Sequence, residues 1–155
     1  MTTAIAQFMR ELEHRWDEHT DALLTRRDVA ASLATIGPVP SVLHIPAMTG
    51  AVGGQGLQRF YAEDFLPHLP GDLLLARISR TVDRFRLVDE MTVSFTHDRE
   101  LPWLLPGVSP TFRRAEVLAI AVVAFERRQV RSVRVLWDYA TLTAQLRIPG
   151  LVTSG

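Results

Sequence analysis

The hydrophobic period of this sequence changes once, and that change limits the possible folds more than any other feature. Up to about residue 66, apolar residues recur mainly every three or four positions, which predicts helices over 5–23, 29–35 and 57–66, with a short strand at 41–45. From Asp72 the period is two, which predicts strands over 73–82, 87–97, 113–125 and 130–137 and a closing helix at 139–146. Helices followed by an antiparallel meander predict an α+β fold.

The composition excludes several classes of chemistry. The 155 residues include no cysteine and no lysine, because all 17 basic residues are arginine. Thiolate nucleophiles, cysteine-type zinc sites, Schiff-base lysines and Walker-type phosphate loops are therefore ruled out. The formal net charge of zero provides no basic footprint for nucleic acid. We expect one domain over residues 1–155, with no cofactor and no metal site.

The sequence contains no visible targeting or membrane segment. The first ten residues, MTTAIAQFMR, lack a basic stretch followed by a long apolar run. The longest apolar run covers only 117–125, whereas a helix that crosses a bilayer needs about 20 residues. We therefore expect a cytoplasmic protein that binds neither membranes nor nucleic acid.

Two of the expected strands carry information on their faces. In 87–97 the odd positions are mostly apolar and should face the core, which places Asp89 and His97 at the two ends of an apolar face. In 116–125 both faces are apolar, so both need cover. One cover is the core, and we expect the other to be a subunit interface in a homo-oligomer.

Several short motifs follow one another over nearly the whole chain: His44-Ile45-Pro46, the glycine loop into Leu57-Gln58-Arg59-Phe60-Tyr61, Phe65-Leu66-Pro67-His68, Val88-Asp89-Glu90, Phe95-Thr96-His97, Trp103-Leu104-Leu105-Pro106-Gly107, and Leu136-Trp137-Asp138 followed by Gln145-Leu146. In this order and spacing they resemble the SnoaL-like polyketide cyclase branch of the nuclear transport factor 2-like superfamily. The resemblance implies a cone: a bent antiparallel sheet wrapped around N-terminal helices, with a deep apolar pocket. It also implies homodimers formed through the outer sheet face.

The same resemblance implies cofactor-independent chemistry, such as cyclisation, double-bond isomerisation, dehydration or epoxide hydrolysis, although some members only bind. This chain departs from the pattern at Val133, where many relatives carry Glu, and at Arg147, where Gly usually follows Gln-Leu. Epoxide-hydrolase relatives use an Arg and two Asp, for which Asp89 and Asp138 are candidates, but Leu87 stands where their Arg precedes the Asp.

Three residues are candidates for catalysis. Asp138 follows Trp137 at the end of an apolar strand, where an aromatic neighbour would raise its pKa, and the resemblance implies an acid/base role; the alternative is a helix cap before Tyr139. Asp89 is either a second pocket carboxylate or half of a buried ion pair with Arg77, Arg80 or Arg134. His97 is either a proton shuttle or structural.

Six further residues are candidates for pocket walls, with plain core packing as the alternative for each. They are Trp16, His44, Tyr61, Met91, Trp103 and Trp137. Together they suggest a pocket for a bulky apolar ligand. The leading hypothesis is a cyclase or isomerase that acts on a polyketide-type substrate by acid/base catalysis or pericyclic ring closure. The alternatives are an epoxide hydrolase or dehydratase, and a non-catalytic small-molecule-binding module.

Overall fold

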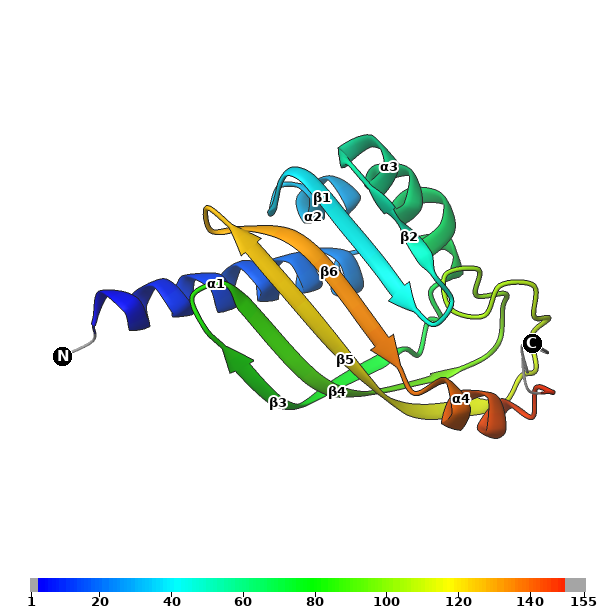
Figure 1. The fold of residues 1–155 in the computed structure, drawn as a ribbon. Coiled ribbons are helices and arrows are strands. Elements are labelled where there is room, and N and C mark those ends of the chain that lie inside the picture. Colours follow the sequence, from blue (N-terminus) through cyan, green and yellow to red (C-terminus); the bar gives the residue numbers. More distant parts are fainter. Residues whose placement is uncertain (1–2, 150–155) are drawn as a thin grey trace, which may run out of the picture.

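A curved six-stranded sheet organises the molecule, and the helices lie against it (Figure 1). The computed structural model describes residues 3–149. The helices are α1 (Ala4–Thr20), α2 (Val29–Leu33), α3 (Gly54–Arg59) and α4 (Tyr139–Leu146). The strands are β1 (Ile36–Ile45), β2 (Thr49–Val52), β3 (Leu74–Val82), β4 (Arg86–Thr96), β5 (Arg114–Glu126) and β6 (Gln129–Trp137), in the order β2-β1-β6-β5-β4-β3. The predicted α+β class is confirmed.

The sequence suggested a fully antiparallel sheet, but the observed sheet contains one parallel pair of strands. β1 runs parallel to β6, while the other four pairs of neighbours are antiparallel. β1 begins at Ile36, five residues before the expected Ser41. The prediction missed its first half because Pro38 and Pro40 are unusual in a strand and hide the pattern. The register with β6 shifts over this stretch, between Ile36 and Ser41.

Strand β2 occupies part of the expected glycine loop, where sequence analysis predicted no strand. Gly50 pairs with Leu43 and adopts a φ of 147°. A Cβ at this position would collide with the carbonyl group of Val42. The close approach of β2 to β1 therefore requires glycine here.

Helix α1 lies against the inner face of the sheet. Thr3 caps it by accepting a hydrogen bond from the backbone N–H of Ala6, and it buries Leu12, Trp16 and His19 at helical spacing. The helix continues into a π-helical turn over Asp21–Thr25, and α3 likewise continues into one over Phe60–Phe65. Such turns are often found at functional sites, and both of these supply walls of the cavity described below.

The two faces of the sheet differ as the strand patterns predict. The odd positions of β4, from Leu87 to Phe95, are buried. On the outer face of β5 and β6, Leu118, Ile120 and Leu136 are 44%, 40% and 42% exposed. The described residues leave this outer apolar face uncovered. None of the helices within residues 3–149 is long and apolar enough to cross a membrane.

The segment between β4 and β5 closes one end of the sheet. Leu101, Trp103, Leu104 and Leu105 are almost completely buried. The indole N–H of Trp103 donates to the carbonyl oxygen of His68 at 3.1 Å, which ties this segment to the end of the α3 region. The apolar stretch in this proline-rich loop therefore acts as part of the core.

Candidate functional site

A cavity of about 230 Å³ lies between α1, the turn around Tyr61 and the inner face of the sheet. All six residues predicted as pocket walls line it: Trp16, His44, Tyr61, Met91, Trp103 and Trp137. Its lining also includes the exposed residues Asp17, Leu75 and Arg77, so the cavity opens to solvent between α1 and β3. The walls are mostly apolar, and their few polar groups lie in three places.

The first polar group is His44, at the aromatic end of the cavity. It extends from β1 into a box formed by Phe60, Phe65, Trp103 and Trp137, whose ring centroids lie 5.4–6.2 Å from its own. The indole N–H of Trp137 donates to Nδ1 of His44 at 3.1 Å. Burial lowers the pKa of His44 from 6.5 to about 4.

These contacts fix the proton on His44. Indole is only a donor, so Nδ1 must be the acceptor and the neutral ring carries its proton on Nε2. No acceptor for this N–H is found among residues 3–149, and Nε2 is not among their fully buried unpartnered atoms. Because His44 lines the cavity, this uncharged N–H is a candidate hydrogen-bond donor to a ligand.

The second polar group is a pair, His19 and Tyr61. Nδ1 of His19 lies 3.1 Å from the carbonyl oxygen of Ser32 and 2.8 Å from Oγ1 of Thr35, while Nε2 lies 3.1 Å from the hydroxyl of Tyr61. Burial lowers the pKa of His19 to about 4 and raises that of Tyr61 well above its usual range. Sequence analysis did not name His19 as a site residue. The feature that could have identified it is its position on the apolar face of the first helix, between Trp16 and Leu23, where a histidine is unusual.

The third polar group lies near the mouth, where Asp89 forms an ion pair with Arg80. Nε and Nη2 of Arg80 donate to the two carboxylate oxygens at 2.7 and 2.9 Å, and the indole N–H of Trp16 donates to Oδ2 at 3.1 Å. Arg80 also contacts Asp17, at 2.7 Å. The bonds to Asp89 raise the pKa of Arg80 above its usual value. This is the ion pair considered as the alternative for Asp89.

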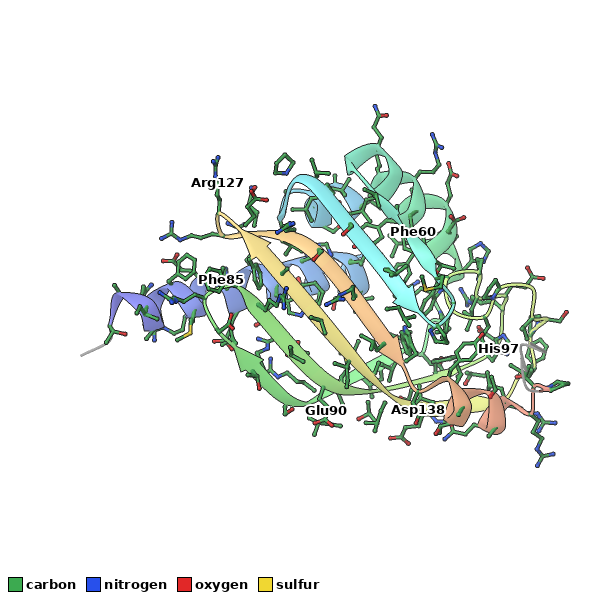
Figure 2. The ribbon with its side chains drawn as sticks, in the orientation of Figure 1. Phe60, Phe85, Glu90, His97, Arg127 and Asp138 are labelled. Atoms are coloured by element: carbon green, nitrogen blue, oxygen red, sulfur yellow. The ribbon has the colours of Figure 1, made fainter. Side chains whose placement is uncertain are left out.

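Asp138 does not line the cavity, and the raised pKa expected for it is wrong. Its carboxylate accepts hydrogen bonds from Oγ1 and the backbone N–H of Thr141, at 2.6 and 3.2 Å, and these bonds hold its pKa below the usual range. Trp137 lines the cavity, whereas Asp138 lies between the end of β6 and the start of α4 (Figure 2). The alternative interpretation, a cap for α4, is confirmed.

His97 also lies outside the cavity, one residue beyond β4 (Figure 2). The backbone N–H of Thr111 donates to its Nδ1 at 3.2 Å, and its buried Nε2 has no hydrogen-bond partner among residues 3–149. Trp103, on the loop that follows His97, is almost completely buried and lines the cavity, whereas His97 is not part of the lining. This position does not support the predicted proton shuttle. Within residues 3–149, no three His, Asp or Glu side chains form a group that could hold a metal ion.

No family model matches the sequence, and no curated protein matches it. Several solved structures match the fold of this chain. A protein named as a SnoaL-like polyketide cyclase from Jannaschia sp. CCS1 gives a TM-score of 0.72 at 17% identity, over 96% of this chain and 97% of that one. An NTF2-like protein of unknown function from Burkholderia pseudomallei gives 0.67 at 18% identity, over 88% and 97%. TerC, co-crystallised with polyporic acid, gives 0.64 at 14% identity, over 88% and 98%.

At these identities the likeness establishes the fold. The protein has the nuclear transport factor 2-like fold, a curved and unclosed sheet around an apolar cavity. Structures named as SnoaL-like polyketide cyclases are among those it resembles, which confirms the predicted resemblance at the level of the fold. A shared fold does not fix the reaction.

Proposed function

We propose that the cavity binds an apolar small molecule of polyketide type and promotes a ring closure or a double-bond shift in it without a cofactor. The observation that carries this proposal is the fixed N–H of His44 inside an enclosure of aromatic and aliphatic side chains. Such a site favours an apolar ligand that has a carbonyl oxygen at one position. The SnoaL-like polyketide cyclases of the same fold, and TerC with its polyporic acid, support a small-molecule ligand.

The proposed catalysis rests on confinement and on one hydrogen bond. Apolar walls hold a flexible substrate in a single folded conformation, which removes part of the entropic barrier to ring closure. Nε2–H of His44 donates to the reacting carbonyl oxygen, and the bond strengthens as negative charge develops there. With a pKa of about 4, the ring stays neutral near pH 7, so it acts as a donor and keeps its proton.

Proton transfer by a carboxylate or a histidine of this chain has less support. Asp138 caps a helix outside the cavity, and Arg80 binds both oxygens of Asp89. His19 stays neutral because its pKa is lowered to about 4. We therefore favour pericyclic or conformationally driven closure over the acid/base variant.

Matched ligands test the binding step. We expect wild-type protein to bind 2-acetylnaphthalene about tenfold more tightly than 2-ethylnaphthalene, because only the ketone accepts from His44. His44→Phe should abolish that preference, whereas the matched control Asp138→Asn should keep it. Equal affinity of both ligands for wild-type protein would contradict the proposal.

Product masses test the reaction. Purified protein incubated with a panel of linear polyketide-type ketones should give products of unchanged mass, whereas loss of one water after an aldol closure would favour the acid/base variant. These products should form faster than without protein, and the rate should fall with His44→Phe. If the ketones bind and none is converted, the protein is a binding module.

Epoxide hydrolysis is a second candidate, because Arg80, beside the cavity mouth, contacts the carboxylates of Asp89, Asp17 and, at 3.6 Å, Glu13. One carboxylate would take a proton from water while the water oxygen bonds to carbon and the epoxide C–O bond breaks, and the resulting carboxylic acid would return that proton to the opened epoxide oxygen. Labelled water would then place oxygen-18 in the diol product. A product without label rules out this candidate.

We also propose that the outer apolar face pairs with a second copy of this chain. Leu118, Ile120 and Leu136 form its centre, and Glu90 and Arg134 flank β5 with opposite charges, which suits two-fold pairing. Light scattering should give a dimer for wild-type protein and a monomer for Ile120→Arg. A monomeric wild type would contradict this. The cytoplasmic location stays a prediction.

A further inference from the structure

The hydrogen bonds around His19 determine what Tyr61 can offer to a ligand. A carbonyl oxygen only accepts, so Nδ1 of His19 carries the proton that is donated to Ser32. Oγ1 of Thr35 already donates to the same carbonyl at 2.7 Å, and so it also accepts from Nδ1. The neutral ring therefore has an unprotonated Nε2, which can only accept from the hydroxyl of Tyr61.

Because of this arrangement, Tyr61 can only accept a further hydrogen bond. Its proton is directed to His19, so the phenol oxygen has only lone pairs to offer. Both residues line the cavity, and both are almost completely buried. A ligand group that meets this oxygen gains a hydrogen bond only if it is itself a donor. His44 has the opposite polarity and offers a donor from another part of the same cavity.

We propose that Tyr61 is a specificity-determining residue that accepts a hydrogen bond from a hydroxyl group of the ligand. The cavity then selects an apolar frame that carries two groups: a carbonyl, which accepts from His44, and a hydroxyl, which donates to Tyr61. The preferred substrates are hydroxy ketones or their enols, and simple ketones and methyl ethers bind less well. This inference rests on the proposed ketone-binding function and adds the second recognition point.

The inference can be tested with the positional isomers of hydroxy-2-acetylnaphthalene and the matching methyl ethers, titrated by calorimetry. For wild-type protein, we expect at least one isomer to bind about tenfold more tightly than its own methyl ether. Tyr61→Phe should reduce that hydroxyl-to-ether ratio to near one. The control Asp138→Asn, outside the cavity, should keep the ratio.

A second measurement applies if Tyr61→Phe does not fold. Donation from a ligand hydroxyl to Tyr61 polarises the Tyr61 O–H and strengthens its bond to His19. The nitrogen-15 signal of His19 Nε2 in the wild type should therefore move when the preferred hydroxy ketone binds, and should move far less with its methyl ether. A structural role for Tyr61 alone would give the same shift for both ligands.

The outcomes separate this inference from the proposed function. If 2-acetylnaphthalene binds with a carbonyl preference and no isomer prefers hydroxyl over ether, the role of Tyr61 is overturned and ketone binding stands. A hydroxyl preference that survives Tyr61→Phe also overturns it, because the acceptor must then be another group such as Asp89. If none of these ketones binds, both proposals fail.

Discussion

The two ends of the cavity bury polar groups in opposite ways. Near the mouth, Asp89 and Arg80 neutralise each other, and their side chains are 9% and 10% exposed. At the aromatic end, His44 is buried, none of the described residues forms an ion pair with it, and burial keeps it neutral. The difference teaches where recognition can arise: paired charges use their bonding capacity within the protein, whereas the neutral donor keeps one N–H for a ligand.

The charged end should give the largest stability effect when it is broken. Arg80→Met leaves the Asp89 carboxylate buried without its partner, and we expect the free energy of unfolding to fall by about 3–5 kcal/mol in urea titrations. The double variant Arg80→Met/Asp89→Leu removes both charges and should recover most of that loss. A loss below about 1 kcal/mol in the single variant would mean that water reaches the pair and screens it.

The neutral end should respond to acid. The unfolded chain binds a proton at His44 below pH 6.5, whereas the folded chain resists protonation until about pH 4, so stability is lost as the pH falls through this window. The loss approaches about 3 kcal/mol, and His19 behaves in the same way. His44→Phe should therefore remove the His44 share of the dependence of unfolding free energy on pH between 6.5 and 4, and the His19 share should remain. An unchanged slope would show that His44 titrates normally.

The bond that orients His44 can be removed without removing the ring. Trp137→Phe deletes the N–H that donates to Nδ1, and we expect a loss of about 1 kcal/mol in unfolding free energy together with a mixed tautomer. The matched control is Trp103→Phe, since Trp103 packs against His44 but donates its N–H to His68. Nitrogen-15 spectra should show a single His44 tautomer in the control. A single His44 tautomer in Trp137→Phe would show that the bond from Trp137 does not set the position of the proton on His44.

The smallest effect should come from the helix cap, which lies outside both ends. Asp138→Ala should lower the unfolding free energy slightly, by less than Trp137→Phe does, and leave the affinity for 2-acetylnaphthalene unchanged. Asp138→Asn should lose less, since Asn also caps helices well. A tenfold loss of turnover in Asp138→Asn, with normal stability, would restore the acid/base role that the resemblance implied.

Periodic features were predictable from the sequence, because burial acts on a whole face of an element. The alternation in 87–97 placed Asp89 on the inner face, and the aromatic and sulfur-containing side chains predicted as walls do line the cavity. The partner of Asp89 was predicted only as one of three arginines, because strand pairing decides which is adjacent. Arg80 faces Asp89 across β3 and β4.

Features that depend on one tertiary contact were not predictable. The step from Trp137 to Asp138 reads equally well as a buried acid or as a cap, because only the tertiary fold decides whether the residue after Trp137 reaches the cavity, and Asp138 does not line it. His19 looked like an ordinary member of a helix stripe until the chain brought Tyr61 to its Nε2. β1 and β6 are far apart in sequence, and nothing local signals their parallel pairing.

Nitrogen-15 spectra of histidine-labelled protein near neutral pH test the central claim most directly. The account predicts that His44 is neutral, with Nδ1 unprotonated and the proton on Nε2. The Nε2–H signal should move when 2-acetylnaphthalene is added, and should move far less with 2-ethylnaphthalene. A charged His44 ring, or a bound ketone that leaves this signal in place, would contradict the account.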